Sequence, residues 1–440
     1  MWPIPLAAVV VTVALGILLP RIDVIVDADL PAGVHSAIFN GGADTARSVL
    51  SSIAGSLITA TSLTFSLTVI ALQLASSQAS PRVLRLFARD SQVHWTLAAF
   101  LGTFAFSVTV LRSVRSSTEE ISEFVPRIAV TLAFVLTLVS VLMLVFFLAH
   151  LAAHLRVETM LKEIHAETDR TIDLVDARNA AATAYPHELS APVSKRAVPA
   201  ASSGFITGHD YDALVALAVN HGIVIEERKR VGEDVVEGTS LAFWWPADGA
   251  SAGQDDEKVE KAVRGAYSIG YERTAAEDIG YGVEQVVDIG LRGLSPGIND
   301  PTTAAHALGH LVAITARQVR ITRLPAVLAG PDGRPCVRTV VQERADDIDA
   351  ALSAMRHYGA DHPSVVRRFV QAVVELASLC PEPDVTAALL AQLDALAQQL
   401  HASDADPATT AELLELTRDA RTTVAPRGNR FAEAAPLVTE

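Results

Sequence analysis

Cysteine is nearly absent from this 440-residue sequence, in which only Cys336 and Cys380 occur. Two cysteines build no disulfide framework, and no Cys/His pattern with zinc-site spacing is present. We therefore expect two buried free thiols and no cofactor. The formal net charge of −15 argues against a nucleic-acid partner, because phosphate binding needs clustered lysine and arginine.

Charge of either sign is missing from long stretches near the N-terminus. Residues 1–155 contain eight arginines, no lysine and eight acidic residues, so the remaining residues carry the whole net charge. The uncharged stretches approach the ~20 residues that a helix needs to cross a bilayer. We predict a transmembrane domain over residues 1–155, with spans at about 4–19, 53–75, 93–111 and 128–151.

The first span and the loops set the topology. The first apolar segment has the length of a signal-peptide core but lacks a basic region before it, so a retained helix is the better interpretation. The loop over residues 76–92 carries three arginines against one acid, whereas the preceding loop is acidic. The positive-inside rule then places both termini in the cytoplasm of a bacterium, with the spans in the inner membrane.

A polar stripe follows the second span. At 100° per residue its members fall within one arc of the helix, and Thr61, Thr64 and Thr68 lie on the opposite side. The stripe consists of Ser52, Ser56, Thr59, Ser62, Ser66 and Gln73. One interpretation is close helix packing through small residues, and the other is a hydroxyl-lined water or ion path at a subunit interface.

The second span is followed by a basic segment. Ser80 and Pro81 suit the start of a short helix, on which Arg82, Arg85 and Arg89 share one face. This segment is predicted to lie at the headgroups, either as a topology anchor or as a cytoplasmic basic collar that attracts anions.

The C-terminal part is predicted to be a cytoplasmic α+β region. Amphipathic spacing predicts a stalk helix over residues 156–180, and a Pro- and Ala-rich linker follows over 181–203. Alternating apolar residues and glycine turns predict a small β module over 204–246. Residues 256–424 are mostly helical, apart from a β-hairpin over 324–340, and a disordered tail is expected over 425–440. The fold class is thus a mainly α membrane protein with four N-terminal transmembrane helices, a small β module and a helical bundle.

A glycine-rich segment lies at the start of this bundle. The glycines at 280, 282, 290 and 293 weaken an isolated helix, so they predict that a neighbouring helix approaches closely. The motif loop after them breaks the helix and starts the next one. It comprises Ser295, Pro296, Gly297, Asn299, Asp300 and Pro301, preceded by Asp288.

Two stretches carry a family resemblance: SLTVIALQLASSQASPRVL at 66–84 and VDIGLRGLSPGINDP at 287–301. The chain resembles a bacterial membrane-protein family catalogued as domain of unknown function 2254. The resemblance implies a membrane location and a shared fold, and it implies no substrate. His306 and His310 depart from the expected pattern; their i, i+4 spacing can bind zinc, but two ordinary helix histidines are the simpler interpretation.

Three functions remain open. The first is a homo-oligomer that forms or regulates an ion-conducting path, with the bilayer and a small ion as partners. The second is a sensory scaffold that binds a cytoplasmic protein. The third is a membrane-anchored enzyme using Asp288, Asn299 and Asp300, but no catalytic constellation is recognisable, and we expect no enzyme.

Overall fold

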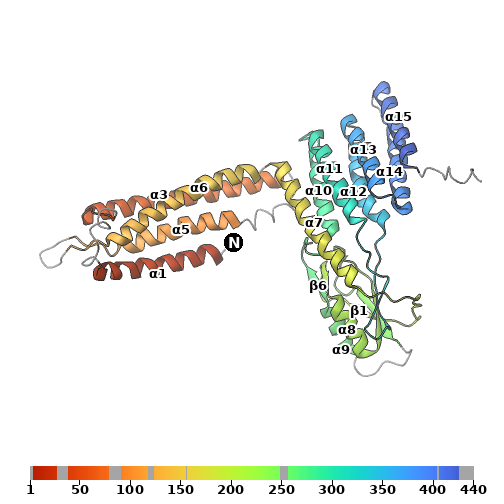
Figure 1. Ribbon diagram of the computed structural model, residues 1–440, viewed down its shortest axis with the longest axis horizontal. Helices are drawn as coiled ribbons and strands as arrows, with labels where there is room; N and C mark the ends of the chain where they lie inside the picture. The colour runs from red at the N-terminus through yellow and green to blue at the C-terminus, as the bar shows by residue number, and fades with distance from the viewer. Residues whose placement is uncertain are drawn as a thin grey trace, which may run out of the picture. The chain divides into compact units, whose positions relative to one another are not determined.

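The computed structural model describes residues 3–26, 38–78, 91–116, 123–154, 156–247, 256–403 and 406–425. The chain divides into two compact units, Met1–Met160 and Leu161–Glu440. Each unit is described by itself below, and Figure 1 labels the helices and some of the strands.

The first unit contains four long apolar helices: α1 (Pro3–Val26), α3 (Ala43–Gln78), α5 (Ser91–Leu111) and α6 (Arg127–His154). All four are long and apolar enough to cross a membrane, so the expected four N-terminal candidate membrane helices are present among the described residues. Helix α5 packs against each of the other three and is about half buried. The outer faces of the other helices remain exposed and apolar, as lipid-facing surfaces are.

The core of this unit lies along α5. Phe100, Phe106 and Val110 pack with Leu50 of α3 and Ala129 of α6. Thr103 and Ser140 share a buried hydrogen bond of 3.1 Å between α5 and α6. Such interhelical hydroxyl bonds satisfy polar groups that lipid cannot.

Helix α3 begins ten residues before the span predicted from hydropathy, at Ala43 rather than 53. Its first turn buries Ala43 and Ala46 in the core and is also held by polar contacts. The Glu123 carboxylate accepts from the Ala43 N–H at 2.7 Å, and the Arg47 guanidinium donates to Ser116 Oγ at 2.9 Å. Hydropathy detects the apolar part of a helix and misses polar turns of this kind.

The second unit starts with α7 (Val157–Ala181), the predicted stalk helix. An α/β part follows, and its elements are β1 (Arg196–Pro199), β2 (Gly204–His209), α8 (Tyr211–His221), β3 (Ile223–Glu227), β4 (Asp234–Val235), β5 (Ser240–Pro246), α9 (Asp256–Gly265) and β6 (Tyr267–Gly270). Strand β1 lies inside the segment expected to be a linker, and β6 lies inside the segment expected to be helical. Both are short strands that are stabilised by distant partners.

Two sheets form this α/β part. The larger has the order β1-β5-β3-β8-β7 and recruits β7 (Val327–Ala329) and β8 (Pro335–Arg338) from the predicted hairpin. Strand β3 pairs with β8 in parallel and with β5 in antiparallel fashion. The smaller sheet has the order β4-β2-β6. The hairpin itself is confirmed, with a positive φ of 76° at Gly333 in its turn.

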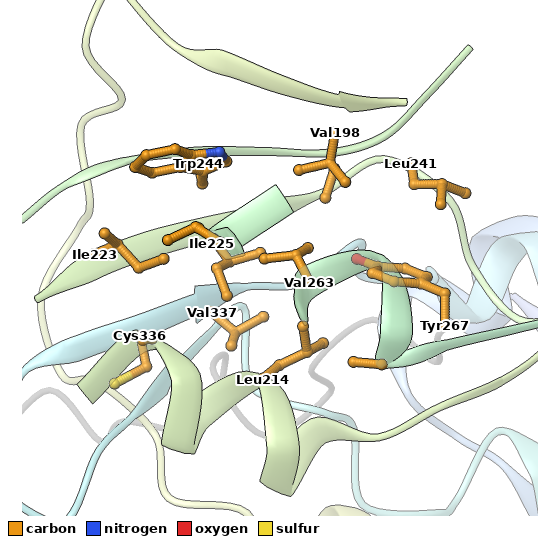
Figure 2. Close-up of a cluster of buried hydrophobic side chains, with 14 of the residues drawn as sticks. Val198, Leu214, Ile223, Ile225, Leu241, Trp244, Val263, Tyr267, Cys336 and Val337 are labelled. Carbon is orange, nitrogen blue, oxygen red and sulfur yellow. The ribbon is translucent and has the colours of Figure 1, made fainter. Parts of the chain in front are cut away.

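A single apolar core joins the larger sheet to α8 and α9. Figure 2 shows Trp244 and Ile225 on the sheet, with Leu214 of α8 and Val263 of α9 beneath them. All four are at most 2% exposed. Removing this much apolar surface from water is the main stabilising term for the module.

Six helices complete the unit: α10 (Ile279–Gly293), α11 (Pro301–Gln318), α12 (Arg344–Gly359), α13 (Pro363–Leu379), α14 (Pro383–His401) and α15 (Pro407–Val424). Four of them, α11, α13, α14 and α15, begin with a proline, whose missing N–H costs nothing in the first turn. The helices pack in neighbouring pairs, such as α10 with α11 and α13 with α15.

Candidate functional site

The polar stripe predicted on the second span lies on an outward face of α3. Every member is exposed in the four-helix unit: Ser52, Ser56, Thr59, Ser62, Ser66 and Gln73. Two of the hydroxyls return their protons to the helix, Ser56 to the Ile53 carbonyl at 3.0 Å and Thr59 to the Gly55 carbonyl at 2.9 Å. The stripe therefore does not serve packing among the described helices of one chain.

The opposite side of α3 faces the core. Leu57 and Thr64 are buried there, and Thr61 and Thr68 are half-buried. Thr61 and Thr68 donate to the carbonyls four residues back, at 2.7 and 2.8 Å. The two polar lines of α3 thus have different environments, and only the stripe is free to meet lipid or another chain.

The predicted basic collar is not part of this description. Arg82, Arg85 and Arg89 lie outside the described residues.

The family motif loop forms the turn between α10 and α11. Ser295 donates its hydroxyl proton to the Arg292 carbonyl at 2.7 Å, and Asn299 adopts a positive φ of 50°. The Asp300 N–H donates to the Gly293 carbonyl at 2.7 Å, which closes the turn. Pro296, Gly297 and Pro301 complete the turn, and Pro301 is the first residue of α11.

Asp300 caps helix α11. One carboxylate oxygen accepts from the N–H groups of Thr302 and Thr303 at 3.0 and 3.3 Å, and the other accepts from the Thr303 hydroxyl at 2.7 Å. The hydrogen bond from the Thr303 hydroxyl lowers the pKa of Asp300 below its usual range, and the two N–H groups act in the same direction. Asp288 lies on α10, five residues before the last residue of that helix, Gly293. The contacts of Asp300 match a capping role rather than acid–base chemistry.

Three of the four α10 glycines, Gly282, Gly290 and Gly293, serve close packing as predicted, whereas a Cβ at Gly280 would meet its nearest neighbours only at 3.4 Å. A Cβ at position 282 would lie 2.8 Å from Thr168 Cγ2 of α7, and one at 290 would lie 2.8 Å from Met355 Cε of α12. A Cβ at 293 would lie 3.0 Å from the Asp300 carbonyl oxygen. Three neighbouring segments therefore approach the α10 backbone directly.

Of the two histidines singled out in the sequence, His306 and His310, the second contacts a histidine of another helix. His310 of α11 contacts His165 of α7, with 2.8 Å between their Nδ1 atoms. Within the described part of the chain, no group of three or more His, Cys, Asp or Glu side chains is arranged to hold a metal ion.

A polar pocket of about 340 Å³ lies where the α/β part of the second unit meets its helices. Its wall is formed by residues of α7, the starts of α8 and α10, the β3–β4 and β6–α10 loops, the α11–β7 segment and the β8–α12 segment. Sequence reasoning did not identify this site, because its residues are spread over some 170 positions.

Four arginines and four acids line the polar pocket, and each arginine pairs with one of these acids; Arg273 and Arg230 also contact Glu284 and Asp346, which lie outside the wall. The nitrogen–oxygen distances are 2.6 Å for Arg178–Glu277, 3.0 Å for Arg230–Glu233, 2.8 Å for Arg273–Asp278 and 2.7 Å for Arg323–Asp347. Because each positive charge has a negative partner, the charged residues of the wall sum to zero. Such a lining favours a ligand without net charge.

Asp347 is the most buried of these acids, at 1% exposed. Besides Arg323, it accepts from Gln318 Nε2 at 2.7 Å and Gln342 Nε2 at 2.6 Å. Burial raises the pKa of Asp347, and the charge of Arg323 opposes that effect.

Glycine backbone opens one side of the polar pocket. Gly232 has a φ of 90°, and a Cβ there would lie 2.5 Å from Asp278 Oδ2. A side chain at this position would collide with the Arg273–Asp278 pair, so only glycine lets the β3–β4 loop approach it.

An apolar pocket of about 780 Å³ adjoins the polar one. The two share Arg178, Tyr211 and Leu324, and the apolar wall continues along α8 with Val215, Ala216 and Val219. The Arg178 guanidinium stacks over the Tyr211 ring at 5.2 Å from its centroid. This stacked pair forms the boundary between the two pockets.

Tyr211 also borders a buried acid–base group. His209 Nδ1 lies 3.1 Å from Glu227 Oε1, and both side chains are at most 2% exposed. The Tyr211 hydroxyl lies 3.2 Å from His209 Nδ1 and 3.4 Å from Glu227 Oε2. Burial and then the Glu227 charge raise the pKa of Tyr211, so its hydroxyl stays protonated.

Comparison with known proteins places the chain in a family. The sequence profile of the predicted membrane protein family DUF2254 matches residues 1–375. This chain belongs to that family. The match covers both units up to α13, and it confirms the resemblance carried by residues 66–84 and 287–301.

Individual relatives come from mycobacteria. Uncharacterised proteins of Mycobacterium bovis and Mycobacterium tuberculosis are each 29% identical over 419 residues, which is 94% of this chain and 78% of the relative. No solved structure matches this chain. The family membership therefore establishes a membrane protein of bacterial type, without an assigned activity.

Proposed function

We propose that this protein is a homo-oligomer of the bacterial inner membrane that forms or regulates an ion-conducting path, with its second unit as a cytoplasmic regulatory domain. The observation that supports this most directly is the outward face of α3. A line of hydroxyls and one amide is exposed there beside large apolar residues such as Leu63 and Phe65.

Exposed hydroxyls gain little from lipid, whereas a second helix or a file of water gives them partners. No Asp, Glu, Lys or Arg occurs in residues 48–81, so the face carries no fixed charge. That composition favours a polar path or a close helix contact over a proton-coupled carrier, which needs an ionisable group at mid-membrane.

Two substitution sets separate a conducting stripe from a packing stripe. Alanine at Ser56, Ser62 and Ser66 keeps the small size but removes the hydroxyls, so assembly should persist while ion flux falls. Leucine at the same positions removes both the size and the polarity, so assembly itself should fail.

Cysteine cross-linking tests the interface. Ser62→Cys and Leu63→Cys are matched neighbours, both exposed on α3 but on different faces. We expect disulfide-linked dimers from Ser62→Cys and not from Leu63→Cys. The native Cys336 and Cys380 are buried and give little background.

Liposome flux with the purified full chain decides the conducting role. Ion flux that depends on the stripe hydroxyls supports the proposal. Absence of flux for common ions and voltages, with dimers still formed at Ser62→Cys, would contradict conduction and leave the second candidate.

That second candidate is a sensory scaffold that binds a cytoplasmic partner. The paired polar and apolar pockets of the second unit favour it, since they give the cytoplasmic part a place to bind a ligand of its own. Co-purification of one defined protein with the full chain, lost when the pockets are filled, distinguishes it from a self-contained channel.

A further inference from the structure

The walls of the polar pocket contain buried polar atoms that have no partner. The Nε atoms of Arg178 and Arg323 are buried donors, and the side-chain oxygens of Asn179 and Gln318 are buried acceptors. None of the four has a hydrogen-bond partner among the described residues. Buried polar groups are rarely left unpaired, because each costs about 1–3 kcal/mol.

The orientations of the two amides are fixed by their other ends. Asn179 Nδ2 donates to the Thr322 carbonyl at 2.9 Å, and Gln318 Nε2 donates to Asp347 Oδ1 at 2.7 Å. A flipped amide would place oxygen against oxygen in both cases. The unpaired atoms are therefore acceptors, and the side chains that carry them are 6% and 5% exposed.

All four atoms belong to residues that line the polar pocket, so a ligand that satisfies them must present complementary groups. The two arginine N–H groups can donate to an acceptor such as a carboxylate. The two amide oxygens can accept from a donor such as an ammonium. A ligand with only an anionic group would add an uncompensated charge to a wall whose charged pairs already cancel. Polyphosphates are disfavoured still more strongly for the same reason.

The adjoining apolar pocket supplies the third element of recognition. It begins at the Arg178–Tyr211 stack and continues along aliphatic and small residues of α8, including Val215 and Ala216. A side chain that leaves the charged head would enter this pocket and bury apolar surface there.

We propose that the two pockets together bind an α-amino acid with an apolar side chain. Its carboxylate meets Arg178 and Arg323, its ammonium meets Asn179 and Gln318, and its side chain lies along α8. The binding site stands independently of conduction, whereas its use as the input of the cytoplasmic regulatory domain rests on the proposed function.

The probe is L-phenylalanine, titrated calorimetrically into the full chain in detergent. Three analogues each remove one element: 3-phenylpropionate lacks the ammonium, 2-phenylethylamine lacks the carboxylate, and glycine lacks the side chain. We expect saturable binding of phenylalanine and at least about tenfold weaker binding of each analogue. Equal binding of 3-phenylpropionate would overturn the zwitterion assignment in favour of an anionic amphiphile.

Two variants locate the site. Arg323→Met should weaken phenylalanine binding about tenfold or more by removing a carboxylate donor. Ala216→Trp fills the apolar pocket from an exposed position, so it should abolish binding without unfolding the chain. Ala213→Trp is its matched control, exposed on the same helix one turn away and outside the pocket wall, and should bind normally.

The outcomes separate this inference from the proposed function. Saturable binding that Ala216→Trp abolishes supports the site whether or not the liposomes conduct ions. Absence of saturable phenylalanine binding to a folded chain overturns the site, even where flux is observed. If phenylalanine binds but leaves the ion flux unchanged, only the regulatory role is overturned.

Discussion

The Nδ1 atoms of His165 on α7 and His310 on α11 lie 2.8 Å apart. At this distance one nitrogen donates a single proton and the other accepts it, so the contact requires that at least one ring be neutral. His165 Nε2 also lies 3.5 Å from the Asp169 carboxylate, which in turn pairs with Arg317. Burial lowers the pKa of His310, so His310 is the ring that stays neutral in this contact.

This contact predicts that the second unit loses stability below neutral pH. Burial lowers the pKa of His310 below its ordinary value of 6.5, and the neighbouring His165 and His306 add to the effect. As pH falls through 6.5, the unfolded chain binds a proton before the folded chain does, so the free energy of unfolding decreases. Thermal unfolding should therefore give a lower Tm at pH 5.5 than at pH 7.5.

A substitution at His310 isolates the contribution of this ring to the pH dependence of stability. His310→Gln keeps a polar side chain but cannot take up the proton, so the difference in Tm between the two pH values should shrink. His221→Gln, at an exposed position on α8, is the matched control and should retain the full difference. An unchanged difference in His310→Gln would show that other groups cause the pH dependence.

Asp300 is predicted to contribute to stability through its cap. Asp300→Ala removes the acceptors of two N–H groups at the start of α11, which typically costs about 1 kcal/mol. Because the pKa of Asp300 is lowered in the folded chain, this contribution is present at neutral pH and is lost as pH falls through that lowered value. Unfolding of wild type and variant at pH 7 measures it.

Helix α12 offers the matched control for this cap. Its N-cap residue, Glu343, makes no side-chain capping hydrogen bond. Glu343→Ala should therefore change the free energy of unfolding much less than Asp300→Ala. Equal losses in the two variants would indicate that helix N-terminal charge, rather than the specific hydrogen bonds, is what stabilises α11.

Local signals in the sequence were sufficient for much of the fold. Apolar runs gave the four spans, Pro331 to Gly333 gave the hairpin turn, and Asp300 before Pro301 gave the start of α11. Each of these signals lies within a few residues of the structure it determines. Local chemistry of this kind is readable without knowledge of distant contacts.

Distant contacts explain what sequence reasoning missed. Strand β1 has one fully buried side chain, Val198, and is stabilised by β5 more than forty residues later. Arg178 and Glu277 pair across 99 positions, and the walls of the polar pocket are brought together only by the complete fold. Nothing near Arg178 in the sequence distinguishes it from an ordinary exposed stalk arginine.

Gly282 is predicted to be essential for the packing of α7 on α10. In an isolated helix, Gly→Ala stabilises by about 1 kcal/mol. At position 282 the new Cβ would lie 2.8 Å from Thr168 Cγ2 and 2.9 Å from Thr168 Cβ, and overpacking of this kind costs about 1–3 kcal/mol. We expect the cost of overpacking to exceed the gain in helix propensity, so Gly282→Ala should lower Tm.

Two further variants test the cause of that loss. Gly265→Ala places a methyl group at the end of α9, where nothing lies within 4 Å, so it should be neutral or stabilising. Thr168→Ala removes Oγ1 and Cγ2, the two atoms nearest to the new Cβ, and should recover part of the loss in the double variant. Strictly additive effects of Gly282→Ala and Thr168→Ala would exclude the contact as the cause.

Asp23 is predicted to hold helices α1 and α6 together in the first unit. Its carboxylate accepts from the N–H groups of Ile128 at 3.0 Å and Ala129 at 3.2 Å, in the first turn of α6, and Asp23 is 3% exposed. Asp23→Ala leaves both N–H groups without this acceptor in a site that water does not reach, at a cost of about 1–3 kcal/mol. Asp23→Asn keeps one oxygen acceptor and should lose less stability.

Asp44→Asn, at an exposed acid of the same unit, is the control and should unfold at the wild-type temperature in the same detergent. If Asp23→Ala matched wild type, the carboxylate would not stabilise this helix pair.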